Sequence, residues 1–274
     1  MTFKPRPKRQ KDTLRELNVR PTKERGQNFL IRPDVPESIA EFGEIPAGAH
    51  VVEIGPGTGA LTSFLAKRAE KLTLIEIEPR FCELLGSAYP QAQIVNQDVR
   101  TVDLSTLGGN LFVFGNIPYV FSTEIVFHLV RNRSAVAQAV LMTQREFAER
   151  IAAEPGGREF GSISVAVQMY ADVDLGPIVP GNAFHPPTEV QSRVMKMRFL
   201  AQPRVAVKDP EHFEKVVRCA FSQRRKKLIN SISSRGLWSR EEIVAALERA
   251  GVSPDIRAEQ LSMEQFAALA RELP

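Results

Sequence analysis

Hydrophobic residues recur at two different spacings along the first 200 residues. Short apolar runs rich in β-branched residues predict buried strands, and apolar residues three to four positions apart predict helices between them. The predicted strands are His50–Ile54, Leu72–Ile75, Gln93–Val95, Leu111–Phe114 and Ala139–Met142, with a closing pair at 173–179 and 191–199. Because strands and helices alternate, we expect a mainly parallel sheet covered by helices on both faces.

Helical spacing is strongest between and after these strands. The predicted helices are Asp34–Phe42, Ala60–Ala69, one with Pro79 in its first turn, Ser122–Arg131 with Ser122 or Thr123 as N-cap, 145–153 and 162–170. Beyond a proline-containing linker at 202–210, only helical patterns occur, at His212–Phe221, Gln223–Ser233, Arg240–Ala250 and Met263–Glu272. We therefore expect an α/β catalytic domain over 26–201 and a small all-α domain over 211–274.

The first 25 residues have a different character. They are basic, interrupted by prolines and poor in apolar residues, which predicts a disordered arm. They carry nine Lys/Arg and three Asp/Glu, and residues 201–274 carry thirteen and ten. Since the whole chain has a net charge of +4, the middle carries −5. Basic charge at both ends suits attachments that bind a polyanion, although a solvated basic tail has the same composition.

Composition excludes several classes of protein. The 274 residues are 43% hydrophobic, enough for a substantial core, but no apolar run is long enough to span a membrane. The basic N-terminus lacks the apolar segment of a secretory signal. The two cysteines lie far apart and the four histidines are scattered, so we expect no disulfide framework and no metal site. The expected compartment is the reducing cytoplasm.

A glycine-rich turn over Glu53–Gly59 follows the first predicted buried strand. Gly55, Gly57 and Gly59 have the spacing G-x-G-x-G. The dinucleotide fingerprint would need glycine in place of Ala60, and no Gly-Lys-Ser/Thr follows as in a phosphate-binding loop. Such a turn, taken alone, is as consistent with a tight bend as with contact to a cofactor.

Acidic residues follow the next two strands. Glu76 lies 21 positions after Gly55, where a carboxylate can accept hydrogen bonds from the ribose hydroxyls of a nucleoside cofactor. A solvent-facing strand end is the alternative, and Glu78 fits that description better. Asp98, after the third strand, is either an acceptor for an adenine amine or a turn residue.

The fourth strand ends in Asn116-Ile117-Pro118-Tyr119. Taken alone, a proline that ends a strand and a tyrosine that fills the core is the simpler interpretation. However, four strands ending in glycine, glutamate, aspartate and asparagine share one edge of a parallel sheet. That is where open α/β sheets bind ligands, so the combination favours a binding site over coincidence.

These motifs together resemble a known family, the ribosomal RNA adenine N6,N6-dimethyltransferases. The matching segments are Gln27–Leu30, Glu53–Gly59, Glu76–Glu78, Asn116–Tyr119 and Ser122-Thr123. The resemblance implies the class I S-adenosylmethionine-dependent methyltransferase fold, Rossmann-like with a mostly parallel seven-stranded sheet. It also implies S-adenosylmethionine as cofactor. One branch of the family dimethylates two adjacent adenosines near the 3′ end of small-subunit (16S) rRNA; the other dimethylates one large-subunit (23S) adenosine and confers macrolide resistance.

Later segments resemble the small-subunit branch. They are Gln144–Arg150, Pro155–Gly157, Phe160–Ser164, Ala220–Ser231 and Arg257–Ser262. Basic residues in two of them are expected to contact the RNA backbone, namely Arg145, Arg224, Arg225, Lys226 and Lys227. The implied partner is small-subunit rRNA in an immature 30S particle, bound by a monomer.

The resemblance also implies roles for individual residues. Cofactor contacts fall on Gln27, Asn28, Leu30, Gly55, Gly57, Gly59, Glu76, Asp98 and Asn116. The target adenine is expected at Asn116, Ile117, Pro118 and Tyr119, with Phe184 as a second aromatic wall. The sequence departs from the family pattern at Val120, usually asparagine, and at Thr188–Gln191, where Glu189 replaces a lysine.

Other functions fit less well. The large-subunit branch shares the chemistry but should lack the Arg224–Lys226 and Arg257–Glu259 segments. A ribosome-assembly RNA-binding factor with reduced catalysis is a second alternative, and the departures from the family pattern at Val120 and Glu189 are consistent with it. The glycine spacing and the lack of an evident catalytic histidine or lysine disfavour a nicotinamide dehydrogenase.

Overall fold

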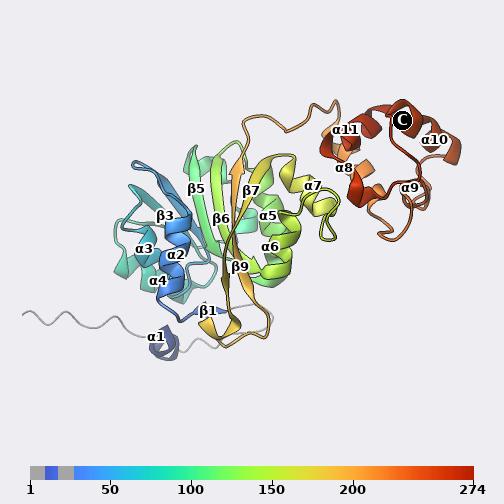
Figure 1. The fold of residues 1–274 in the computed structure, drawn as a ribbon. Helices are drawn as coiled ribbons and strands as arrows, with labels where there is room; N and C mark the ends of the chain where they lie inside the picture. The colour runs from blue at the N-terminus through green and yellow to red at the C-terminus, as the bar shows by residue number, and fades with distance from the viewer. Residues whose placement is uncertain (1–9, 18–27) are drawn as a thin grey trace, which may run out of the picture. The chain divides into compact units, whose positions relative to one another are not determined.

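The structure is a computed structural model in which residues 10–17 and 28–274 are described. The chain divides into two compact units (Figure 1). Of the described residues, the first unit contains 10–17, 28–148 and 174–199, and the second contains 149–173 and 200–274. The expected boundary near residue 201 therefore misses residues 149–173, which group with the C-terminal helices.

The main sheet is mostly parallel, as predicted. Within the described residues it has seven strands in the order β4-β3-β2-β5-β6-β9-β7. Its strands are β2 (His50–Ile54), β3 (Lys71–Ile75), β4 (Gln93–Val95), β5 (Leu111–Asn116), β6 (Val136–Gln144), β7 (Ala171–Val179) and β9 (Ser192–Phe199). β2 to β6 pair in parallel, and β9 runs antiparallel to β6. A separate two-stranded pair, not predicted, joins β1 (Phe29–Leu30) to β8 (Phe184–His185).

Helices flank the sheet of the first unit. Figure 1 shows α2, α3 and α4 grouped apart from α5 and α6. Their bounds are α2 (Asp34–Phe42), α3 (Thr62–Leu65), α4 (Pro79–Ala88), α5 (Ser122–Arg131) and α6 (Arg145–Ile151). Most residues of the central strands are buried, and Val51, Leu74, Val113 and Phe114 have no exposed surface. Burial on both faces explains why these strands are continuously apolar in the sequence.

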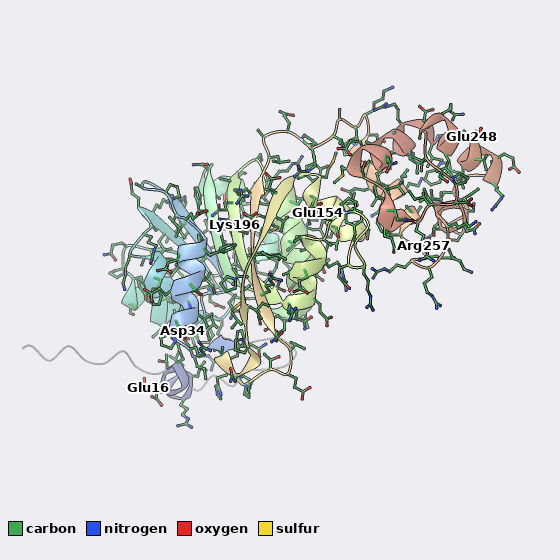
Figure 2. All side chains as sticks on the ribbon, in the orientation of Figure 1. Glu16, Asp34, Glu154, Lys196, Glu248 and Arg257 are labelled. Carbon is green, nitrogen blue, oxygen red and sulfur yellow. The ribbon has the colours of Figure 1, made fainter. Side chains whose placement is uncertain are left out.

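The second unit is built from helices around aromatic residues. Phe221 lies between the rings of Phe160 and Phe266, with centroids 6.0 and 5.7 Å away. The helices are α7 (Ser162–Gln168), α8 (Pro210–Ala220), α9 (Leu228–Ser233), α10 (Arg240–Arg249) and α11 (Met263–Glu272). Ser239 and Ser262 begin α10 and α11 with reciprocal capping bonds, which explains why these starts were predictable. Arg257, labelled in Figure 2, opens a short turn between α10 and α11, where its backbone N–H donates to Gln260.

Two predicted helices, α3 and α9, were wrong in extent, and a third, α5, has the predicted bounds but a different N-cap. α3 has four residues instead of ten, because the chain around it forms tighter turns in which Phe64 N donates to Leu61 O (3.0 Å). α9 begins at Leu228, and residues 223–227 form a turn closed by Lys226 N and Gln223 O at 3.0 Å. Neither Ser122 nor Thr123 is the N-cap of α5; Phe121 occupies that position.

The expected disordered arm is also interrupted by structure. Residues Gln10–Glu16 form α1, and Leu14 is 3% exposed within the core cluster of the first unit. Burying one leucine of a short amphipathic stretch stabilises it despite the basic composition. The rest of the expected arm, residues 1–9 and 18–25, lies outside the described residues.

Candidate active site

The strand register brings the four predicted strand ends together. Ile54 pairs with Ile75 on one side and Gly115 on the other, and Ile75 pairs with Val95. The next residues along these strands are therefore neighbours at one edge of the sheet. Gly115 permits this close approach, because a Cβ at that position would lie 2.9 Å from the Ile54 carbonyl oxygen.

A cavity of about 290 Å³ opens at this edge. Its walls include most of the residues predicted for the cofactor and the target base. Those that line it are Asn28, Leu30, Gly55, Gly57, Glu76, Asp98, Asn116, Ile117, Pro118 and Tyr119. A concave, partly apolar site with convergent polar groups is the usual form of a ligand-binding pocket.

Glu76 is an acceptor in this cavity whose carboxylate is held by two backbone N–H groups. Its Oε2 accepts from Gly57 N at 3.0 Å and its Oε1 accepts from Glu78 N at 2.9 Å, and the side chain is buried. Burial raises the pKa of Glu76 above its usual range, while the backbone donors of Glu78 and Gly57 oppose that shift. These bonds fix the carboxylate between the glycine turn and the start of α4, and its remaining lone pairs are left for a ligand.

Glu53 is a second buried carboxyl in the cavity wall, and its environment differs. It is 2% exposed and accepts one hydrogen bond, from Thr62 Oγ1 at 2.6 Å. Burial raises the pKa of Glu53 to about 8. At neutral pH the side chain is therefore mostly protonated, a neutral group bonded to Thr62 at the start of α3.

Asp98 has the opposite shift. The guanidinium of Arg100 bonds both of its oxygens, with Nη2 to Oδ2 at 2.6 Å, and holds the pKa of Asp98 below its usual range. Arg100 also lies over the ring of Phe121, with Cζ 4.1 Å from the centroid. Arg100 and Phe121 both line the cavity, so this carboxylate faces it as part of an ion pair.

The amide of Asn116 has a defined orientation. Its Nδ2 donates to the backbone carbonyl oxygen of Asn28 at 2.9 Å. A carbonyl oxygen can only accept, so this contact requires the NH₂ group and assigns the amide without ambiguity. The Oδ1 of Asn116 is consequently the acceptor that this residue presents in the cavity wall.

Tyr119 is held by its hydroxyl group. Its OH lies 2.6 Å from Oγ of Ser192, the buried first residue of β9, and burial raises the pKa of the phenol. Ile117 N donates to Met142 O at 3.2 Å, which ties the segment to β6. The ring of Tyr119 is therefore fixed at the cavity rather than buried in the core. Val120, beside it, is 56% exposed.

The structure does not bring every predicted residue to the cavity. Gly59 lies behind it, where a Cβ would meet Leu85 at 3.1 Å, and its φ of +84° indicates a tight turn. Phe184 is 1% exposed in the core cluster and is not in the cavity wall, although its partner in the β1–β8 pair, Leu30, is. Gln27 lies outside the described residues.

The predicted RNA-contacting residues occur in both units. In the first unit, Arg145 Nη1 donates to Gln191 Oε1 at 2.8 Å. In the second, Arg224 donates to the carbonyl of Arg158, and Lys227 pairs with Asp255 at 2.6 Å. Among the described residues, the exposed side chains of Arg225 and Lys226 have no hydrogen-bond or ion-pair partner.

Sequence reasoning missed several residues of the cavity wall. Ile77 is apolar yet 56% exposed, next to Glu76, and Phe29 lies opposite the glycine turn with its ring 3.0 Å from where a Cβ of Gly57 would be. Arg100 and Phe121 were missed because the stacking of the guanidinium on the ring brings together two turns that are separate in the sequence. Phe121 follows Tyr119 by two positions, and that spacing was the only available signal.

No helix in the described part of the chain is long and apolar enough to cross a membrane. Over residues 10–17 and 28–274, no group of three or more His, Cys, Asp or Glu side chains is arranged to hold a metal ion.

Comparison with known proteins adds independent evidence. Residues 19–274 match the family described as "Ribosomal RNA adenine dimethylase". The chain is 39% identical to ribosomal RNA small subunit methyltransferase A of Latilactobacillus sakei, covering 96% of this chain and 93% of that one. It is 38% identical to the protein of the same name from Geobacter metallireducens, covering 95% and 98%.

Solved structures agree with the fold. The 23S rRNA methyltransferase ErmE superposes with a TM-score of 0.71 at 28% identity, covering 90% of this chain and 99% of that one. A dimethyladenosine transferase from Plasmodium falciparum superposes with a TM-score of 0.75 at 24% identity, covering 88% and 95%.

Proposed function

The chain belongs to the ribosomal RNA adenine dimethylase family, and from that premise we propose that it dimethylates N6 of two adjacent adenosines near the 3′ end of small-subunit (16S) rRNA. Relatives named for the small subunit match nearly the whole chain, including the second unit. The observation that carries the proposal is Asn116: it lines the same cavity as Glu76, and because its amide nitrogen donates to the Asn28 carbonyl oxygen, its amide oxygen is left as an acceptor.

The residues of the cavity fit S-adenosylmethionine. Glu76 is proposed to accept the ribose hydroxyls, because its carboxylate is already oriented by Gly57 and Glu78. Gly55 has a φ of +63° and open space where a side chain would be, so its backbone can approach a ligand closely. Ile77 offers an exposed apolar face for a flat ring. When bound, S-adenosylmethionine supplies an electrophilic methyl group on its sulfonium.

Asn116 and Ile117 are proposed to orient the nucleophile. An adenine amino group is a poor nucleophile because its lone pair is delocalised into the ring. The Oδ1 of Asn116 and the carbonyl oxygen of Ile117 accept the two amino hydrogens, which favours a pyramidal nitrogen with its lone pair directed along the line of attack. The N6 cation formed by methyl transfer is strongly acidic and loses a proton readily, so no dedicated general base is needed.

Tyr119 is proposed to stack on the extruded adenine. A fixed aromatic face contributes about 1–3 kcal/mol per stacked base, and the bond to Ser192 holds this ring in place. Pro118 fixes the backbone between the amide and the ring. Phe184 was the expected second wall, but it is not among the residues that line the cavity; Phe121, which stacks on Arg100, lines it instead.

Several finer features belong to the proposal. The second unit, with its basic turn at Arg224–Lys227, is proposed to bind the RNA backbone through charge. The substrate is proposed to be small-subunit rRNA in an immature 30S particle, the active species a monomer, and the compartment the cytoplasm. The basic charge at both ends of the chain supports binding to RNA.

The test uses purified full-length protein with S-adenosylmethionine labelled in the methyl group. Immature small-subunit particles, mature small subunits and free large-subunit rRNA are offered as separate substrates, and products are located by mass spectrometry. We expect dimethyladenosine at adjacent positions near the 3′ end of the small-subunit rRNA. Modification of a large-subunit adenosine instead, or binding of the small-subunit particle without methyl transfer, would overturn the proposal.

A further inference from the structure

The side chain of Arg100 is occupied on two sides at once. Its edge faces Asp98, with Nε 3.1 Å from Oδ1 and Nη2 2.6 Å from Oδ2. Its face lies on the ring of Phe121, with Cζ 4.1 Å from the ring centroid. A planar guanidinium can use its edge for a carboxylate and its face for an aromatic ring at the same time, and an ammonium group cannot.

This contact links two loops with different roles. Asp98 caps η1 (Val99–Thr101), the turn that follows β4 on the proposed cofactor side of the cavity. Phe121 ends η3 (Tyr119–Phe121), the turn that begins with the proposed base-stacking residue. Arg100, Phe121 and Tyr119 all line the cavity. A displacement of Phe121 must therefore move the turn that carries Tyr119.

The other attachments of η3 hold different atoms. The hydroxyl of Tyr119 is fixed by Ser192, and Phe121 N donates to Pro118 O at 3.1 Å within the turn itself. These contacts set one end of the tyrosine ring and the local shape of the turn. The stack on Arg100 is a side-chain contact from η3 to the loop after β4, so it supplies a restraint that the others do not.

We propose that Arg100 is a positioning residue for methyl transfer: clamped by Asp98 and stacked on Phe121, it holds η3 so that Tyr119 faces the target adenine. The inference rests on the proposed function. It also gives Asp98 a role: its carboxylate binds Arg100 and so helps to hold η3 through that side chain. Misplacement of a reacting group by about 1 Å can cost about a hundredfold in rate, so a partial loosening of η3 should be measurable.

The experiment is a double-mutant cycle on the full-length protein. The variants are Arg100→Ala, Phe121→Leu and the pair combined, with Arg100→Lys and Phe121→Trp as conservative changes. Each is measured for single-turnover methyl transfer to small-subunit particles, for the Kd of S-adenosylmethionine by calorimetry, and for Tm. Stacking is followed by fluorescence of RNA carrying 2-aminopurine at the target position, which is quenched when an aromatic ring lies against it.

We expect each single variant to lower the single-turnover rate about tenfold and to lose most of the quenching, with the Kd for S-adenosylmethionine changed less than about threefold. The combined variant should be no slower than the slower single variant, because both changes remove the same contact. Phe121→Trp should retain the rate, since indole is the better partner for a cation, and Arg100→Lys should not.

Arg32 provides a matched control. It forms a fork with Asp34 at the same spacing of two residues, but both side chains are exposed and neither lines the cavity. Arg32→Ala should leave the rate and the quenching unchanged.

Three results would overturn the inference. Additive effects of the two changes would show that Arg100 and Phe121 act separately. A higher KM for RNA with a flatter salt dependence and unchanged quenching would make Arg100 a phosphate contact. If the variants lose rate only because less of the protein is folded, as a lower Tm would show, and Phe121→Trp does not restore the rate, the contact is merely structural. Failure of the wild-type protein to methylate would instead refute the proposed function.

Discussion

The cavity edge of the first unit and the basic turn of the second differ in how their polar groups are held. At the cavity, Glu76 accepts two backbone N–H bonds and Asn116 donates to a backbone carbonyl, so each group has one orientation. In the turn, Arg225 and Lys226 are exposed and, within the described residues, have no side-chain partner. Fixed groups can orient a reaction, whereas mobile charges can attract a polyanion without a defined geometry.

The difference predicts how each region responds to substitution. Changes at the cavity should reduce the rate or cofactor affinity and depend little on salt, because they remove a specific geometry. Changes in the turn should weaken RNA binding in proportion to the charge removed and should be masked by salt.

The largest effect is expected for Asn116→Ala. The substitution removes the acceptor proposed to orient N6 and frees the Asn28 carbonyl, so methyl transfer should fall by at least about a hundredfold. The measurement is a single-turnover rate with saturating cofactor and RNA, together with a circular dichroism spectrum to verify the fold. Tyr119→Phe, which keeps the ring and removes only the bond to Ser192, is the comparison and should lower the rate less than Asn116→Ala does. A rate near that of the wild type for Asn116→Ala would remove the residue from the proposed site.

Some of the features behind these predictions could be predicted from the sequence, and others could not. The bounds of β2, α2 and α11 were predicted correctly, because local hydrophobic pattern and caps such as Ser262 determine them. The edge of the sheet was also predictable, since parallel strands present their carboxyl ends together. The atoms that these residues present to the cavity were not predictable, because they depend on contacts such as that between Asn116 and Asn28, which lie 88 positions apart.

Other failures have the same physical origin. Phe184 lies in β8, which pairs with β1; each of these strands has only two residues, too few to produce a pattern from which its burial could be predicted. The stack of Arg100 on Phe121 joins two turns whose proximity is set by the parallel pairing of β4, β3, β2 and β5. The helix expected at Gln223 does not start there, because the carbonyl of Gln223 accepts from Lys226 N and from Ser231 Oγ.

Glu53 should make stability depend on pH. Its folded-state pKa of about 8 is above the ordinary glutamate value of about 4.3, so the folded state binds more protons between these values. Stability from this group is therefore full below about pH 4, falls as the pH rises toward 8, and is constant above that. Glu53→Gln removes the titration and should gain a few kcal/mol relative to wild type between pH 5 and 8.5, because one pKa unit is worth about 1.4 kcal/mol.

Urea unfolding of both proteins without cofactor at the two pH values measures this difference. The same substitution at Glu83, an exposed residue of α4, is the control. An equal change in unfolding free energy for wild type and Glu53→Gln between the two pH values would contradict a buried, neutral Glu53.

Glu76→Ala should act on cofactor binding. The substitution removes the proposed acceptor of the ribose hydroxyls and leaves the N–H groups of Gly57 and Glu78 without a partner. Hydrogen bonds to a charged group are worth about 1.5–3 kcal/mol, so the Kd for S-adenosylmethionine should rise about 10- to 100-fold. Calorimetry measures the Kd directly. Glu78→Gln is the matched control, because Glu78 contacts Glu76 through its backbone N–H while its side chain pairs with Arg80. If both variants bind the cofactor as wild type does, Glu76 is not the ribose acceptor.

The smallest effect is expected from the basic turn. Arg225→Gln with Lys226→Gln removes two charges, and the slope of log K against log salt for RNA binding should become shallower by about 1.4–1.8. The cofactor Kd should stay constant, because no geometry at the cavity changes. Lys67→Gln with Arg68→Gln removes the same charge from the first unit and is the control for net charge. An equal change of slope for both double variants would mean that overall charge attracts the RNA and that the turn has no special part in binding.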